Sequence, residues 1–188
     1  PLEETCRAFN TLIEQGKILY WGVSEWSKDE IMKAVMLCES LNLHKPVSNQ
    51  PQYSMLSRGI ETNGVMDYCT KKGIGQVVWS PLAQGVLTGK YNVKNIEKDS
   101  RLLDKKNNMF VKSIASEKNL KKVSKLIKIS DDTGITVANL ALAWCLRMKI
   151  ISSVITSATK ESQLKENLKA ADVELSKETL TKIDKILK

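Results

Sequence analysis

Short apolar runs alternate along the chain with stretches in which apolar residues recur every three or four positions. The apolar runs span residues 17–23, 46–50, 76–80 and 150–155, of which 46–50 is the least apolar. Runs of this length are typical of strands that are buried on both faces of a parallel sheet. Because helical spacing fills the intervals, the pattern predicts four strands alternating with helices, as in βαβ units.

Polar residues and glycines mark where several of these helices begin and end. Apolar positions recur at helical spacing from Leu2 to Ile13, and Gly16 follows where a helix end takes a left-handed residue. Ser27 and Glu30 have the spacing of a capping box. Further helices are expected over 64–72 with Gly73 at the end, as one helix over 114–127, over 136–144, over 159–167 with Thr159 as the cap, and from Ser176 onward.

Four parallel strands with their helices leave two architectures open. An eight-stranded α/β barrel needs about 250 residues, so this chain of 188 residues corresponds to half of a barrel or to a free-standing doubly wound domain. In both folds ligands bind at the carboxyl ends of the strands. Those ends carry Ser24 and Glu25, Asn49 and Gln50, Trp79 and Ser80, and Ser157 with Thr159. The sequence therefore predicts a ligand site on one face of the sheet.

Composition and charge indicate an ordinary globular domain rather than a nucleic-acid-binding surface. The chain is 42% hydrophobic and 27% charged, with a net charge of +8. Residues 92–130 contain eleven Lys and Arg side chains and four Asp and Glu side chains, and the rest of the chain is nearly neutral. A single solvated basic segment explains this distribution, so no nucleic-acid partner is expected.

The cysteines and the hydropathy exclude further classes of protein. The four cysteines form no C-x-x-C pair, and His44 is the only histidine, so neither a zinc site nor a disulfide framework is expected. A reducing, cytoplasmic setting fits this usage. No apolar run approaches the roughly 18 residues that span a bilayer, so no membrane insertion is expected. The first residue is Pro1 rather than Met, which predicts that the true start of the protein is missing.

Two glycine-bearing motifs resemble nucleotide-binding loops without matching them. Gly73 and Gly75 precede a strand instead of following one, so the dinucleotide fingerprint G-x-G-x-x-G is absent. The segment from Gly85 to Lys90 is one residue too short for a P-loop, and Tyr91 replaces the Ser or Thr that would hold magnesium. From the residues alone, Lys90 is either a solvated loop lysine or a clamp on a phosphate.

The single histidine and two tryptophans have different expected places. His44 lies at the entry to a strand, opposite the predicted site, which favours a surface or packing role over catalysis. Trp144 lies on a helical apolar stripe and is expected in the core. Trp79 ends a strand beside Ser80 and Pro81, so stacking on a ligand and simple packing both remain open.

Five strings in the sequence together resemble the aldo-keto reductase family. They are Y-W-G-V-S-E-W-S at 20–27, N-Q-P-Q-Y at 49–53, W-S-P-L-A-Q-G-V-L-T-G-K-Y at 79–91, L-A-W-C at 142–145, and S-V-I-T-S-A-T at 153–159 followed by Gln163, Glu166 and Asn167. The likeness is strongest to the branch that contains voltage-gated potassium channel β-subunits. It implies that residues 1–188 are the C-terminal half, strands five to eight, of a single (β/α)8 TIM-barrel domain whose N-terminal half is absent.

The resemblance also implies NADPH/NADP+ as cofactor. Ser24 and Gln50 would hold the nicotinamide carboxamide, and Trp79 lies where the family stacks an aromatic ring on the nicotinamide. Glu25 replaces an Asn or Arg that often follows this serine, although plant members carry Glu there, and Ser157 replaces a usual glycine.

The remaining cofactor contacts implied by the resemblance come from two segments. In chain order they are Ser80, Pro81, Leu82, Gln84, Lys90, Thr159, Gln163, Glu166 and Asn167. The pyrophosphate would be followed by Ser80, Leu82 and Gln84. The adenosine 2′-phosphate would be met by Lys90, Thr159 and Gln163, and the adenine by Glu166 and Asn167.

No catalytic residue is expected within this chain. The family's catalytic Asp, Tyr, Lys and His are carried on strands two to four, before this chain begins, so the fragment alone is expected to be inactive. The resemblance implies a parent oxidoreductase that reduces small aldehydes or ketones with NADPH. The alternative is a regulatory, homo-oligomeric β-subunit of a potassium channel that uses bound NADP(H) as a redox sensor. Nothing in these residues separates the two.

Overall fold

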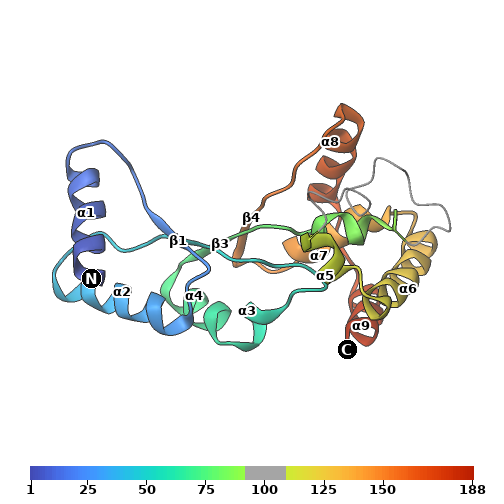
Figure 1. Cartoon of the computed structure of the whole chain (residues 1–188), viewed down its shortest axis with the longest axis horizontal. Coiled ribbons are helices and arrows are strands. Elements are labelled where there is room, and N and C mark those ends of the chain that lie inside the picture. The colour runs from blue at the N-terminus through green and yellow to red at the C-terminus, as the bar shows by residue number, and fades with distance from the viewer. Residues whose placement is uncertain (92–108) are drawn as a thin grey trace. The chain divides into compact units, whose positions relative to one another are not determined.

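The computed structural model describes residues 1–91 and 109–188 (Figure 1). The strands are β1 (Gly22–Ser24), β2 (Ser48–Gln50), β3 (Gly75–Val78) and β4 (Ile151–Val154). The helices are α1 (Leu2–Glu14), α2 (Lys28–Ser40), α3 (Gly59–Thr62), α4 (Val65–Lys72), α5 (Met109–Ile114), α6 (Glu117–Thr133), α7 (Val137–Leu146), α8 (Glu161–Leu168) and α9 (Lys177–Leu187), with 3₁₀ helices η1 (Ala83–Thr88) and η2 (Lys169–Asp172).

The chain divides into two compact units. Unit 1 comprises Pro1–Gln52, Arg58–Trp79 and Lys149–Ser153, and it contains the sheet with α1 to α4. Unit 2 comprises Tyr53–Ser57, Ser80–Met148 and Val154–Lys188, and it contains α5 to α9. The predicted site residues are therefore divided between these two units.

The four strands form one sheet in the order β1-β2-β3-β4. The pairs β1·β2 and β2·β3 are parallel, with Gly22 opposite Ser48 and Ser48 opposite Gly75. Each strand follows the previous one in space as it does in sequence, and helices join them, so the prediction of a parallel α/β fold is confirmed.

The two faces of the sheet differ sharply in side-chain size. Val23, Asn49 and Gln76 point to the face that is buried, and α4 packs against β3. The opposite face has no room for side chains at two glycines: a Cβ at Gly22 would lie 2.3 Å from the Ser48 Oγ, and a Cβ at Gly75 would lie 2.3 Å from an Oγ of β4. Because side chains alternate along a strand, Ser24 and Gln50 lie on this second, uncovered face.

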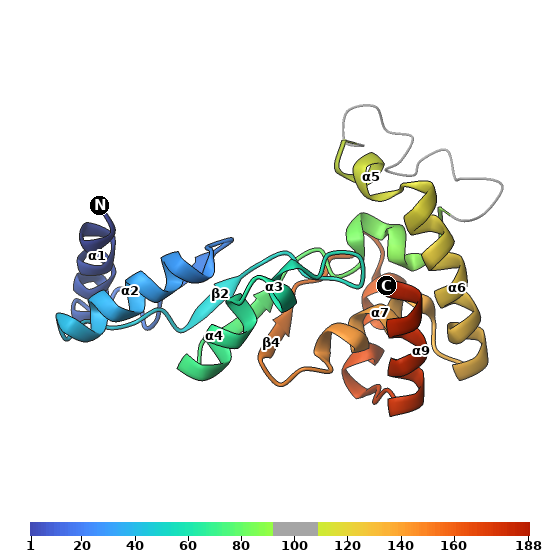
Figure 2. The ribbon, with the colours of Figure 1, turned by 90° about the horizontal axis from the view of Figure 1, so that it is seen from below.

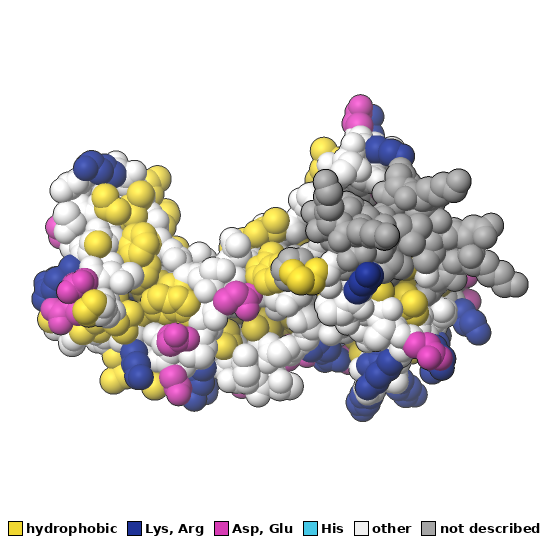
Figure 3. All heavy atoms as spheres, viewed as in Figure 1, with side chains coloured by type: hydrophobic (Ala, Val, Ile, Leu, Met, Phe, Trp, Pro, Cys, Tyr) yellow, Lys and Arg dark blue, Asp and Glu magenta, His cyan; other side chains and the backbone are white. Residues whose placement is uncertain are grey.

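The strands are shorter than the apolar runs that predicted them. The expected strand over 17–23 begins only at Gly22, and the expectation of burial on both faces is wrong for Leu19 and Tyr20, which are 78% and 73% exposed. Figure 3 shows hydrophobic side chains gathered over α1. An apolar run indicates that its side chains are buried or in contact somewhere in the protein, but it does not show where a strand begins. Strand geometry extends only as far as a neighbouring strand supplies hydrogen bonds.

Most helix ends follow the local signals. Gly16 and Gly73 both adopt φ = +68°, as expected for residues that end helices. The capping box at α2 is complete: the Ser27 Oγ accepts from the Glu30 backbone N–H at 3.3 Å, and a Glu30 carboxylate oxygen accepts from the Ser27 N–H at 2.8 Å. The single helix expected over 114–127 is wrong, because the chain breaks at Ser116, which caps α6 separately from α5.

The complete capping box predicts a measurable stability loss when its serine is removed. Replacing Ser27 by Ala should lower the free energy of unfolding by about 1 kcal/mol. The Glu30 backbone N–H loses its acceptor, and the Glu30 carboxylate that accepts from the N–H of residue 27 is held less firmly. Urea unfolding measures this change. Ser40→Ala at the other end of α2 is the matched control, since the Ser40 hydroxyl only donates to the Leu37 carbonyl. Equal losses in both variants would contradict the prediction.

Helix α7 forms the core of unit 2. It packs against α6, α8 and both 3₁₀ helices, while α6 lies beside α9 (Figure 2). Leu140 and Trp144 are fully buried, which confirms the expected core position of Trp144. The Trp144 ring stacks on Tyr53 with centroids 5.3 Å apart, and the Arg147 guanidinium lies 3.6 Å from its centre.

The basic segment lies only partly within the described residues. Its basic residues at 94, 98, 101, 105 and 106 are outside them. On α6, Lys118, Lys121 and Lys125 are exposed, and Lys121 pairs with Glu117 at 2.6 Å. The prediction of a solvated basic helix is therefore confirmed for α6.

Candidate functional site

The predicted nicotinamide residues of unit 1 lie at the carboxyl ends of three adjacent strands. The Ser24 hydroxyl donates to the Gln50 backbone carbonyl at 2.9 Å, which links the ends of β1 and β2. Trp79 continues β3 with a parallel bridge to Gln52, and its backbone N–H donates to the Pro51 carbonyl at 3.1 Å. The side chains of Ser24 and Gln50 are exposed and that of Trp79 is half-buried.

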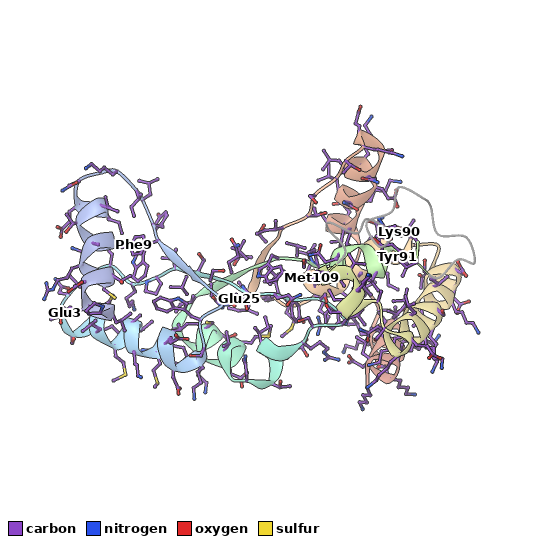
Figure 4. All side chains as sticks on the ribbon, in the orientation of Figure 1. Glu3, Phe9, Glu25, Lys90, Tyr91 and Met109 are labelled. Atoms are coloured by element: carbon purple, nitrogen blue, oxygen red, sulfur yellow. The ribbon has the colours of Figure 1, made fainter. Side chains whose placement is uncertain are left out.

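Glu25 joins these strand ends in a way that the sequence did not predict. One of its carboxylate oxygens accepts from the Gln52 backbone N–H at 2.5 Å and from the Trp79 indole N–H at 2.7 Å. Figure 4 shows Glu25 directly after β1. This hydrogen bond therefore engages only the N–H edge of the Trp79 indole, and Glu25 covers neither face of the ring.

Asn49 does not take part in the site, although it was grouped with the polar residues of the strand ends. It is fully buried on the opposite face of β2, where its amide donates to the Gln76 side-chain oxygen at 3.1 Å. The alternation of side chains along the strand separates it from Gln50. The expectation that both neighbours face the ligand is wrong for Asn49.

The loop after β3, which belongs to unit 2, has an unusual backbone. Ser80, Ala83 and Gln84 all have positive φ, at 54°, 49° and 58°, and Gly85 follows at 89°. Each non-glycine residue in this region costs roughly 1 kcal/mol or more. The Gln84 amide donates to the Ser80 hydroxyl at 2.6 Å, which closes the loop on itself. Within the loop, the Ala83 N–H donates to the Ser80 carbonyl, and the Gly85 and Leu87 N–H groups donate to the Leu82 carbonyl.

Lys90 follows the end of η1, and its side chain lies over the loop that begins at Ser80. A Cβ at Gly85 would lie 3.0 Å from the Lys90 Cε, so the lysine stem passes over this glycine. The Lys90 ammonium lies 5.1 Å from the centre of the Tyr91 ring, and Figure 4 shows the two side chains next to each other. Lys90 is exposed and forms no ion pair with another described residue. The Tyr91 hydroxyl is buried without a hydrogen-bond partner among the described residues.

Thr159 is not the cap of α8, which corrects the sequence prediction. The helix begins at Glu161 with Lys160 as its N-cap and no side-chain hydrogen bond at the cap. Instead, the Thr159 backbone N–H and hydroxyl both donate to the Gln163 side-chain oxygen, at 2.9 and 3.2 Å. The Gln163 oxygen is thus engaged inside the protein, so its amide N–H groups are the atoms free to meet a ligand.

The last two predicted residues hold helices together. One Glu166 oxygen accepts from the Thr136 hydroxyl at 3.0 Å and from the Asn139 amide at 2.9 Å, and the other pairs with Lys169 at 2.7 Å. The hydrogen bond from Lys169 is the main reason that the pKa of Glu166 lies below its ordinary value. The Asn167 amide donates to the Thr156 hydroxyl at 2.9 Å. These contacts give both residues a structural role beside the predicted adenine role.

Other candidate chemistry does not form a site in the described part of the chain. No group of three or more His, Cys, Asp or Glu side chains that could hold a metal occurs there. All four cysteines are buried and none forms a disulfide, and burial, with Cys6 beside it, raises the pKa of the Cys38 thiol to about 12. None of the described helices has the length and apolar character that crossing a bilayer requires.

His44 lies at the other end of the sheet from Ser24. It is exposed beside the start of β2, in a pocket of about 300 Å³ with Leu19 and Val47. Its backbone N–H donates to the Asn10 side chain and its carbonyl accepts from the Trp21 indole. This position confirms that the only histidine lies away from the predicted site.

In unit 1, Ser24 offers hydroxyl lone pairs, Gln50 an amide and Trp79 an aromatic face, which fit a nicotinamide ring and its carboxamide. In unit 2, Lys90 offers an exposed cation without a carboxylate partner in the described residues, which fits a phosphate. A nicotinamide dinucleotide contains both of these chemical groups.

A parallel α/β fold with polar groups at the carboxyl ends of its strands is the arrangement in which barrel and doubly wound proteins bind their ligands. The aldo/keto reductase family model matches residues 1–188, and the chain belongs to this family. The four parallel strands are accordingly part of its TIM barrel. The resemblance drawn from the sequence strings is thus confirmed.

Among curated relatives, the chain is similar to two plant proteins. It is 47% identical over 174 residues to a "Probable voltage-gated potassium channel subunit beta" of Arabidopsis thaliana, which covers 92% of this chain and 53% of that protein. It is 42% identical over 190 residues to a protein of the same name from Oryza sativa subsp. japonica, which covers 100% of this chain and 58% of that protein. The chain thus spans about half the length of these relatives.

Proposed function

We propose that this chain is the cofactor-binding, C-terminal half of an NADPH-dependent oxidoreductase that reduces aldehydes or ketones in the cytoplasm. The observation that carries the proposal is the loop from Ser80 to Gly85, whose left-handed residues directly follow Trp79 and lie beneath the Lys90 stem. Strain of this kind persists where a site over-determines it. Membership of the aldo/keto reductase family supports the same reaction class.

At the nicotinamide end, the residues of unit 1 bind and orient the ring. Bound NADPH supplies a hydride from its nicotinamide. The Ser24 hydroxyl, whose hydrogen is directed to the Gln50 carbonyl, presents lone pairs to the carboxamide N–H groups, and the Gln50 side chain can both donate and accept. Trp79 covers one face of the ring and excludes water from it.

At the phosphate end, the residues of unit 2 bind the charged part of the cofactor. The loop of Ser80, Leu82 and Gln84 follows the pyrophosphate, while Pro81 between them has no N–H to donate, and Lys90 provides a positive charge for the 2′-phosphate. The Gln163 amide N–H groups add donors near the start of α8, beside Thr159, whose own N–H and hydroxyl donate to the Gln163 oxygen, and Glu166 with Asn167 borders the adenine.

The proton that a carbonyl reduction requires is assigned to the other half of the barrel. Tyr20, Tyr53, Tyr68 and Tyr91 are the tyrosines of this chain. Of these, Tyr20 precedes β1 and Tyr68 lies within α4, so neither lies at the strand ends beside Ser24 and Trp79 in unit 1. The chain alone therefore binds cofactor and does not turn over substrate.

A second function is favoured by the names of the relatives. Both plant proteins are described as potassium channel β-subunits. In this alternative the protein is a homo-oligomer that binds a channel and uses bound NADP(H) as a redox sensor. Turnover of a small aldehyde by the complete protein distinguishes the two: steady NADPH oxidation supports the enzyme, and tight binding without oxidation supports the sensor.

Tryptophan fluorescence tests the proposed nicotinamide site. Adding NADPH to the complete protein should quench tryptophan emission, and Trp79→Ala should remove most of that quench because the stacked indole is gone. Trp26→Phe is the control, since Trp26 lies two residues past the end of β1 and has no predicted cofactor contact. An unchanged quench in Trp79→Ala would assign Trp79 to packing alone.

A further inference from the structure

Glu25 makes the most specific polar contact at the strand ends of unit 1. A single carboxylate oxygen accepts both the Gln52 backbone N–H at 2.5 Å and the Trp79 indole N–H at 2.7 Å. These donors follow β2 and β3, so one side chain from the end of β1 connects all three strand ends. The second carboxylate oxygen has no hydrogen bond among the described residues.

The backbone of Glu25 is strained to make this contact. Its φ is +57°, in the left-handed region that glycine and asparagine accept more readily than glutamate. No ion pair with another described residue neutralises its charge, and both of its hydrogen-bond donors are neutral. A strained residue that carries a charge without a partner at a ligand site is expected to act on the ligand.

The charge of Glu25 distinguishes the two redox forms of a nicotinamide. The oxidised ring is a cation and the reduced ring is neutral, so a nearby carboxylate attracts only the oxidised form. The carboxylate oxygen lies at hydrogen-bond distance from the indole that is proposed to stack on the ring. A negative charge one aromatic ring away therefore acts on the nicotinamide with little solvent between them once the site is filled.

We infer that Glu25 is a positioning residue that fixes the Trp79 indole and makes the site prefer NADP+ over NADPH. The inference rests on the proposed function, because it requires a nicotinamide on Trp79. It goes beyond that function, since it assigns the residue after Ser24 to the tryptophan and to redox preference instead of to the carboxamide. A purely structural clamp would fix the strand ends equally well with a neutral acceptor.

Separate titrations of NADP+ and NADPH test this inference. Glu25→Gln keeps a side-chain oxygen that can accept from the indole but removes the charge. In the complete protein it should raise the ratio of Kd for NADP+ to Kd for NADPH by about three- to tenfold, as expected for one charge acting across a partly solvated site. Glu25→Ala should raise the ratio similarly and also weaken both forms, because the indole loses its anchor.

Glu4→Gln is the control, because it removes a carboxylate from the first turn of α1 and should leave the ratio of the two Kd values unchanged. An unchanged ratio in Glu25→Gln, with both cofactors still bound, overturns the inference and leaves the proposed function intact. Failure of the unaltered protein to bind either cofactor overturns the proposed function, and this inference with it.

Discussion

Replacing Lys90 by Met should weaken NADPH binding by about 1.5–3 kcal/mol while leaving NADH binding nearly unchanged. NADPH differs from NADH by one phosphate of roughly −2 charge. Lys90 is an exposed cation with no ion-pair partner among the described residues, so its charge is available to that phosphate. The loss corresponds to a rise in Kd of about 13- to 160-fold for NADPH alone.

Titration of both cofactors with the complete protein measures the effect. Lys125→Met on α6 is the control, because it removes one charge from the solvated basic helix and tests long-range attraction only. Equal losses for NADPH and NADH in Lys90→Met would show that the lysine holds the shared pyrophosphate or the loop. The assignment of Lys90 to the 2′-phosphate would then be withdrawn.

Truncating Trp144 to Ala should destabilise the protein by about 3–5 kcal/mol, the usual cost of a large cavity in a core. The side chain is fully buried in α7, which contacts most other elements of unit 2. Its removal also leaves the Tyr53 ring and the Arg147 guanidinium without the surface on which they stack. For a domain of this size the melting temperature should fall by roughly 6–20 °C.

Thermal unfolding followed by circular dichroism provides the measurement. Leu146→Ala is the matched control, because this residue lies on the same helix but is 37% exposed, and its truncation should cost far less. Similar losses in the two variants would show that Trp144 is not central to the core of unit 2.

Local chemistry in the sequence was sufficient wherever a structure depends on neighbouring residues. The Ser27 and Glu30 capping box and the left-handed Gly16 both depend on contacts within one or two turns of chain. The order of strands and helices, and hence the parallel fold, follows from the same local periodicity. The cofactor residues came instead from the resemblance of whole strings to a family, and their roles stay predictions.

Tertiary structure alone decided the features that depend on residues far apart in the chain. β1 begins at Gly22 because only there does a neighbouring strand pair with it, which an apolar run cannot show. Asn49 faces away from the site because strand register sets its side.

The contact between Glu25 and Trp79 shows the same limit most clearly. Fifty-four positions separate the two residues in sequence, and only the sheet brings the carboxylate to the indole N–H. A hydrogen bond between side chains at the ends of different strands produces no periodic pattern in the sequence. The residues next to Glu25 and next to Trp79 in the chain do not predict that these two side chains meet. The sequence by itself therefore determined the order and type of the elements, whereas the parallel pairing of strands decided which side chains meet at their ends.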